Sequence, residues 1–134
     1  MLVVLDTNIL VSALLSPFGP PARVLDMVLS GDIQAAYDDR LMAEYREVLA
    51  RPKFSFAPED VAVVLAYLEA DGQQVTARPL SYKLPDLDDL PFLEVATQAE
   101  AVLITGNTAH YPKGLRGEVQ VVAPGEFVRA WRRS

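Results

Sequence analysis

The sequence predicts an α/β fold in which helices flank a parallel β-sheet. Short apolar segments alternate along the chain with longer segments whose apolar residues recur at helical spacing. Leu2–Leu5 is the clearest strand, because a wholly apolar run is typical of a parallel strand covered on both faces. Such alternation implies crossover connections between neighbouring parallel strands. The 134 residues are expected to form one domain, 1–134, since domains hold about 150 residues.

The remaining elements follow from apolar spacing and from the placement of glycine and proline. A helix over Thr7–Leu15 follows the first strand, and Gly31 ends a second helix over Pro21–Ser30. The third helix, Asp39–Arg51, has a well-defined apolar stripe. The other expected elements are strands at Ile33–Tyr37, Gln74–Ala77, Val102–Thr105 and Val119–Val122, and helices at Pro58–Ala70, Asp88–Ala99 and Gly125–Arg132.

Composition excludes several classes of site. The chain has no cysteine, so it forms no disulfide framework, thiolate zinc site or iron–sulfur cluster. Its one histidine, His110, rules out a multi-histidine metal site. His110 is expected to be a surface loop residue, with contact to a substrate as the alternative. The formal charge of −6 means that the protein as a whole repels polyanions. A nucleic-acid function would therefore depend on a local basic patch or on bound cations.

The sequence shows no sign of a membrane segment or a secretion signal. The longest apolar run is Val61–Leu68, far short of the roughly 20 residues that span a bilayer. The first strand begins at once, with no basic segment and no small-residue cleavage site before it. We expect a cytoplasmic protein that does not contact membranes.

Oxygen-bearing side chains follow two of the expected strands. Asp6 and Asn8 come directly after the first strand, and Asn107 follows the strand at Val102–Thr105. In open parallel sheets ligands bind beyond the carboxyl ends of the strands, which makes these residues candidates for a site. The alternative is that Asp6 or Asn8 only caps the following helix, because both residue types are favoured there.

The third helix carries two glutamates that differ in their expected direction. At about 100° per residue, Glu44 lies at the border of the apolar stripe, whereas Glu47 lies about 60° further out and faces water. The alternative for both is surface pairing at i,i+4 spacing, Glu44 with Arg40 and Glu47 with Arg51. The stripe itself consists of Leu41, Met42, Tyr45, Val48 and Leu49.

The segment 85–92 is the most acidic part of the chain. Pro91 fits only the first turn of a helix, so the helix is expected to start near Asp88 or Asp89. Asp89 then shares the inward face with Phe92, and Asp88 is the expected N-cap. No lysine or arginine occurs in the range 84–112, so a bound divalent cation is expected to relieve the repulsion between these carboxylates.

The candidate ligands are all oxygens, and this favours hard ions. Mg²⁺ and Mn²⁺ suit such ligands, and two ions about 3.5–4 Å apart can activate water and stabilise the leaving oxygen of a phosphodiester. Other chemistries lack their residues. The chain has no nucleophilic serine elbow, no phosphate-binding Walker sequence and no glycine-rich dinucleotide fingerprint.

Four blocks of the sequence together resemble a known family. They are the Asp6-Thr7-Asn8 block with its flanking apolar residues, and the ranges 41–54, 86–96 and 103–107. Their content, order and spacing resemble the PIN domains, in particular the subgroup of toxin components of bacterial and archaeal toxin–antitoxin systems. The resemblance covers nearly the whole chain.

The resemblance implies a three-layer α/β/α sandwich with a five-stranded parallel sheet and a metal-dependent endoribonuclease activity on single-stranded RNA. The family's acidic metal ligands map to Asp6, Glu44 and Asp89, and its neighbouring hydroxyl maps to Thr7. Asp86 matches an extra acidic position of the subgroup. Mg²⁺ or Mn²⁺ is the implied cofactor.

The fourth block departs from the family pattern. It usually reads Thr-Gly-Asp, and here Asn107 stands at the acidic position, which makes it a weaker fourth ligand. This departure supports an alternative function, a PIN module with weak metal binding that acts by binding RNA or a protein. An antitoxin and a second copy of the chain are the expected protein partners. The candidates for holding the RNA backbone are Arg40, Arg46, Arg51 and Lys53, whose alternative role is a solvated helix face.

Overall fold

The computed structural model describes residues 1–81 and 83–133 and contains an all-parallel sheet of five strands in the order β3-β2-β1-β4-β5. This arrangement confirms the predicted α/β class and the parallel sheet. The central strand β1 pairs with β2 on one side and with β4 on the other. The strands are β1 at Leu2–Leu5, β2 at Gln34–Tyr37, β3 at Gln73–Gln74, β4 at Val102–Ile104 and β5 at Val121–Val122.

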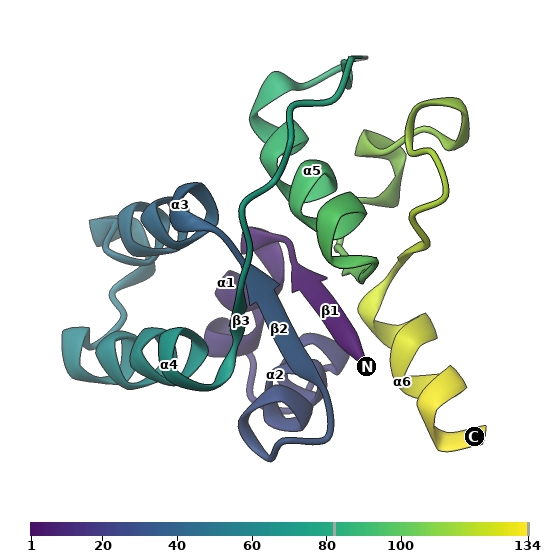
Figure 1. Ribbon diagram of the computed structural model, residues 1–134. Coiled ribbons are helices and arrows are strands. Elements are labelled where there is room, and N and C mark those ends of the chain that lie inside the picture. The colour runs from purple at the N-terminus through teal and green to yellow at the C-terminus, as the bar shows by residue number, and fades with distance from the viewer. Residues whose placement is uncertain (82, 134) are drawn as a thin grey trace.

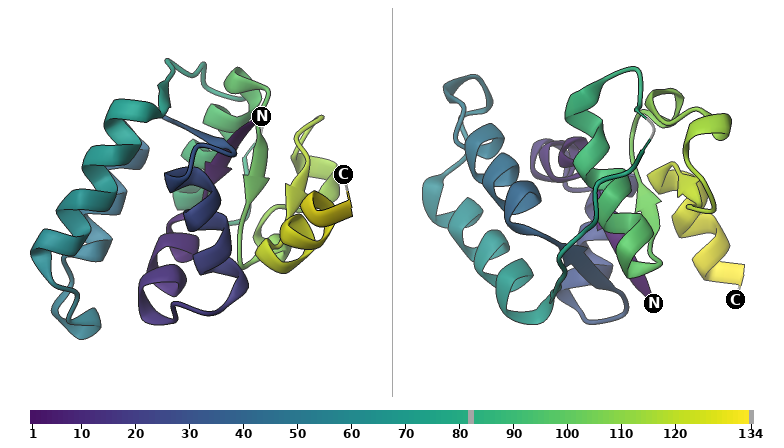
Figure 2. Two further views of the ribbon diagram at one scale, coloured as in Figure 1. Left: turned by 90° about the horizontal axis from the view of Figure 1, so that it is seen from below. Right: turned by 45° about the horizontal axis from the view of Figure 1, so that its top comes forward.

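Helices cover both faces of the sheet and complete the three layers. In Figure 1, α5 lies in front of the sheet and α1 and α2 lie behind it, and Figure 2 shows the same layers from below. Helices α3 and α4 pack against each other beside β2. The helices are α1 at Thr7–Leu15, α2 at Pro20–Leu29, α3 at Asp39–Leu49, α4 at Pro58–Asp71, α5 at Leu90–Ala99 and α6 at Pro124–Arg133. In the described part of the chain, none of them is long and apolar enough to cross a membrane.

The core lies on both sides of the central strands. Val3, Val4 and Leu5 of β1 are almost completely buried, as expected of a parallel strand with helices on both faces. Phe92 and Leu93 of α5 cover one face of the strands. Tyr45 of α3 donates a hydrogen bond from its hydroxyl to the Leu5 carbonyl, so that α3 is fixed against the end of β1.

Most of the expected elements are present with shifted ends, but two local predictions are wrong. The strand expected at Gln74–Ala77 is reduced to Gln73–Gln74, at the edge of the sheet. Asp88 does not cap the fifth helix. Instead a 3₁₀ turn at Leu87–Asp89 precedes α5, and the Asp86 carboxylate caps that turn by accepting from the Asp88 backbone N–H.

Arg40 at the start of α3 joins three elements through two buried carboxylates. Its guanidinium donates to Asp38 Oδ2 at 2.9 Å and to Glu94 Oε1 at 2.7 Å. The other oxygen of Glu94 accepts from the backbone N–H of Leu80, in the segment that leads from β3 to α5. The Asp38 carboxylate also caps α3 through the Leu41 N–H. This network attaches α5 to α3 and explains why Arg40 does not pair with Glu44 as the surface alternative required.

We predict that Arg40→Gln lowers the free energy of unfolding by about 2 kcal/mol, because it leaves two buried carboxylates without their cation. Arg51→Gln is the matched control, since Arg51 pairs with Glu47 on the exposed face of the same helix, and we expect it to cost at most about 0.5 kcal/mol. Urea unfolding at neutral pH measures both. Equal, small losses would show that the Arg40 network does not hold α5 in place.

Candidate metal centre

Asp6 stands at the carboxyl end of β1, where its carboxylate is buried and held by two hydroxyl groups. Thr105, directly after β4, donates to Asp6 Oδ2 at 2.9 Å, and Tyr111 donates to the same oxygen at 3.0 Å. The side chain makes no capping bond to α1, so the alternative that Asp6 serves as a helix cap is wrong. Burial raises the pKa of Asp6, and the two hydroxyl donors offset part of this effect.

Thr7, the residue after Asp6, holds the second candidate ligand, Glu44. The Thr7 hydroxyl donates a hydrogen bond to Glu44 Oε2, which links the start of α1 to α3. Glu44 is half-buried, whereas Glu47 is exposed and pairs with Arg51, as the helical geometry predicts. Burial raises the pKa of Glu44, and the negative charge of Asp6 raises it further. Asp6 therefore lies close enough to Glu44 to disfavour the ionisation of Glu44.

A third group of ligand atoms comes from the turn before α5 and from the loop after β4. Asp86, Asp89 and His110 each offer one ligand atom, and these atoms lie within 4.8 Å of one another. His110 Nδ1 is 3.0 Å from Asp89 Oδ2. The pKa of Asp89 is raised to about 6, mainly by burial and then by the negative charges of Asp6 and Asp86. Asp89 therefore lies near Asp6, although it ends the 3₁₀ turn at Leu87–Asp89 and does not lie on a helix face as the sequence predicted.

The loop after β4 is attached to the end of β1 by an amide side chain. Asn8 Oδ1 accepts from the Gly106 N–H at 2.9 Å, and Thr105 Oγ1 accepts from the Asn107 N–H at 3.0 Å. Asn8 therefore connects the first turn of α1 to the loop after β4, and it does not cap α1, whose N-cap position is Asp6. The Asn107 side chain points its nitrogen at His110 Nε2, 2.9 Å away.

The donor set fits a divalent cation. Asp6, Glu44 and Asp89 are carboxylates from three different elements, and the negative charge of Asp6 raises the pKa of the other two. Among the described residues, no lysine or arginine forms an ion pair with any of them. Carboxylate oxygens without a lysine or arginine partner are the environment that Mg²⁺ and Mn²⁺ occupy in proteins.

The basic residues predicted to hold RNA lie on α3 or just after it, and the arginines already have acidic partners. Lys53 lies over the Phe54 ring, with Nζ 5.1 Å from its centroid. The ion pairs are Arg40 with Asp38 and Glu94, Arg46 with Glu69, and Arg51 with Glu47. Contact with RNA stays a prediction for all four.

Sequence reasoning did not identify three residues that contact the site. Thr105 ends an expected strand at the same edge of the sheet as Asp6, so the rule that selected Asn107 could have selected it. Tyr111 and His110 follow in a loop without helical or strand periodicity, and no sequence signal places them beside Asp6 and Asp89. His110 is exposed as expected, but it also belongs to the candidate centre.

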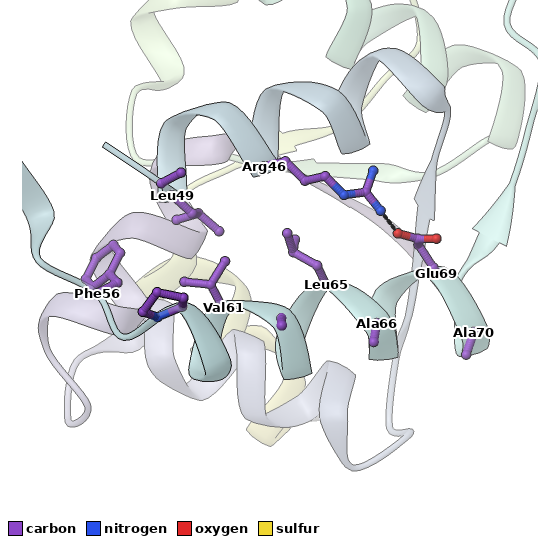
Figure 3. A pocket seen from close by; sticks show the side chains of 11 residues that line it. Arg46, Leu49, Phe56, Val61, Leu65, Ala66, Glu69 and Ala70 are labelled. Carbon is purple, nitrogen blue, oxygen red and sulfur yellow. Dashed lines mark ion pairs between the residues drawn. The ribbon is translucent and has the colours of Figure 1, made fainter. Parts of the chain in front are cut away.

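An apolar groove of about 780 Å³ lies between α3 and α4, apart from the acidic residues. Figure 3 shows Phe56, Val61 and Leu65 along it, with the Arg46–Glu69 ion pair spanning its other end. None of the candidate metal ligands lines this groove. Its lining is mainly apolar and suits an apolar surface of a partner, and its two charged residues, Arg46 and Glu69, pair with each other.

We predict that Asp89→Asn stabilises the metal-free protein at pH 8 by about 1 kcal/mol and has no such effect below about pH 4. The folded-state pKa lies above the ordinary value of 3.8. Below pH 3.8 Asp89 is protonated in both the folded and the unfolded state, so it does not lower the free energy of unfolding there. As the pH rises through about 6, ionisation becomes more costly in the folded state than in the unfolded state, and this stability is lost. Urea unfolding across this range checks it, with exposed Asp26→Asn as control. A benefit that is equal at all pH values would contradict the assigned electrostatics.

Solved structures of low sequence identity share this fold. One is the structure of VapBC2 from Rickettsia felis bound to a DNA fragment from the VapBC2 promoter. It matches with a TM-score of 0.61 and 17% sequence identity, and the match covers 92% of this chain and 98% of that one. The Neisseria gonorrhoeae FitAcB structure matches with a TM-score of 0.60 and 19% identity, again over 92% of this chain and 98% of that one. At these identities the likeness concerns the fold alone.

Comparison at the sequence level identifies the family. The uncharacterized protein MJ1680 of Methanocaldococcus jannaschii is 30% identical over 142 residues, covering 98% of this chain and 92% of that protein. A family model described as PIN domain matches residues 2–109, a range that includes Asp6, Glu44 and Asp89. The chain therefore belongs to the PIN-domain family.

Proposed function

We propose that this protein is a metal-dependent endoribonuclease that hydrolyses phosphodiester bonds of single-stranded RNA with Mg²⁺ or Mn²⁺. The observation that carries the proposal is that Asp6 lies close enough to Glu44 and Asp89 for its charge to raise the pKa of both, while none of the three forms an ion pair with a lysine or arginine among the described residues. Membership of the PIN family supports the nuclease class, because PIN domains are typically nucleases. We further propose that the protein acts in the cytoplasm.

The side chains of this site divide into ligands and residues that hold the ligands in place. Asp6, Glu44 and Asp89 are the main proposed ligands. Asp86 and the amide oxygen of Asn107 are proposed as additional, weaker ligands. The Thr7 hydroxyl holds Glu44, and the Thr105 and Tyr111 hydroxyls hold Asp6. A bound Mg²⁺ or Mn²⁺ would supply an activated water and neutralise charge on the phosphate. These fixed contacts reduce the reorganisation needed when the ion and the RNA bind.

The proposed biological role is that of a toxin with a protein antitoxin. The four sequence blocks that resemble the toxin subgroup support this role. The VapBC2 structure with the same fold is described as bound to a DNA fragment, so the fold occurs in a DNA-bound assembly. The apolar groove between α3 and α4 offers a surface for a partner protein. A homodimer is the second proposed assembly.

Asn107 favours a second candidate function, an RNA- or protein-binding module with little catalysis. An amide brings no formal charge and attracts a cation less than a carboxylate does. RNA cleavage separates the two functions. The binding module would bind RNA without cutting it at any Mn²⁺ concentration.

We predict that the protein cleaves single-stranded RNA when Mn²⁺ is present and not after chelation of the metal. Glu44→Gln is expected to reduce the rate at least about 100-fold, because a proposed ligand loses its charge. The matched control is Glu47→Gln, three residues along the same helix, which should stay within about twofold of the unchanged protein because Glu47 faces water. Cleavage of a labelled single-stranded RNA at several Mn²⁺ concentrations measures both effects.

Three results would contradict the proposal. Cleavage that persists after chelation would exclude a metal-dependent reaction. Equal loss in the Glu44 and Glu47 variants would remove Glu44 from the site. Binding of RNA without cleavage at saturating Mn²⁺ would favour the binding module.

A further inference from the structure

Both ring nitrogens of His110 have a hydrogen-bonding partner within the candidate centre. Nδ1 lies 3.0 Å from Asp89 Oδ2, and Nε2 lies 2.9 Å from Asn107 Nδ2. The ring therefore connects the loop after β4 with the turn that precedes α5. His110, which the sequence predicted to be a surface loop residue, therefore contacts the proposed metal ligand Asp89.

The chemistry of the two partners selects one tautomer of the ring. An amide nitrogen only donates, so Nε2 must accept from Asn107 and carries no proton. An ionised carboxylate oxygen only accepts, so Nδ1 must carry the proton and donate to Asp89. The two contacts are independent, and both require the same Nδ1–H form. This is the opposite of the form that predominates for neutral histidine in water.

We infer that His110 is a positioning residue that holds the Asp89 carboxylate through its Nδ1–H, in a tautomer fixed by the Asn107 side chain. The bond occupies Asp89 Oδ2 and leaves Oδ1 for the cation. Partners of this kind orient metal-binding carboxylates, and their loss typically weakens metal binding by 10–100-fold. The inference rests on the proposed metal site, because it concerns how one of its ligands is oriented.

The same geometry gives Asn107 a role that an aspartate could not fill. A carboxylate at position 107 can only accept, so Nε2 would have to carry the proton. The ring would then lose its donor toward Asp89 unless it gained a second proton. Asn107 departs from the usual motif of the family, but its amide can donate a hydrogen bond to His110 Nε2, three residues later, which an aspartate could not do. The two residues act together to direct Asp89.

The first experiment measures the tautomer directly. His110 is the one histidine of the sequence, so ¹⁵N–¹H correlation spectra of the metal-free protein at pH 8 contain its ring signals without overlap. We expect a protonated Nδ1 and an unprotonated Nε2, and we expect Asn107→Asp to put a proton on Nε2. An Nε2–H ring in the unchanged protein, or a spectrum that Asn107→Asp leaves unaltered, would overturn the inference.

The second experiment measures Mn²⁺ affinity by calorimetry for two replacements of the ring. An asparagine places its amide nitrogen near the position of Nδ1, whereas a glutamine places it near Nε2. His110→Gln is expected to weaken Mn²⁺ binding at least about tenfold, and His110→Asn to stay within about threefold of the unchanged protein. The control is Ala109→Ser, at the exposed neighbouring position, which should leave the affinity unchanged. Metal-free melting temperatures should agree among all variants, because position 110 is exposed.

The outcomes separate this inference from the proposed function. Equal Mn²⁺ affinity in the Gln and Asn variants would overturn the positioning role, even if the protein cleaves RNA. The expected tautomer together with the expected difference in affinity would support it, even if the unchanged protein cleaves no RNA. A metal-induced change that places the ion on a His110 nitrogen would identify His110 as a ligand and would overturn the positioning role.

Discussion

The buried carboxylate of Asp6 is the constraint on which the arrangement of the site depends. It ends the central strand, and the hydroxyls of Thr105 and Tyr111 hold it from the neighbouring strand end and from the loop beyond. The next residue, Thr7, holds Glu44, so the positions of two proposed ligands depend on two consecutive residues. This geometry follows from the sheet order, because β1 and β4 are adjacent and parallel and their carboxyl ends meet at the same edge.

The chain buries carboxylates in two different ways, and the contrast separates structure from function. Asp38 and Glu94 are buried with Arg40 between them, so their charges are compensated within the fold. Asp6, Glu44 and Asp89 form no ion pair with lysine or arginine in the described ranges, and the pKa of each is raised. Carboxylates that lack a lysine or arginine partner cost stability when they are ionised, and proteins retain such sites where function needs them.

The sequence indicates the positions of the proposed ligands better than those of the residues that hold them. Glu44 follows from helical geometry and Asp6 from its position after an apolar strand, since both depend on local periodicity. Tyr111 and His110 contact residues that are 105 and 21 positions away along the chain, and their own segment has no periodic pattern. The N-cap prediction failed at Asp88 because several aspartates compete there, and Asp86 caps a 3₁₀ turn that apolar spacing does not reveal.

The charge distribution indicates what must attract an RNA substrate. The protein has a formal charge of −6, and the arginines of α3 and its end are paired with acids, as Arg46 with Glu69 and Arg51 with Glu47. Paired side chains contribute less long-range attraction than free ones, because the field of each pair falls off quickly with distance. The phosphates of an RNA would therefore meet their strongest attraction at the proposed ion itself. On this view the proposed cation would serve both binding and chemistry, and ligand orientation by residues such as Thr7 and His110 would affect substrate affinity as well as rate.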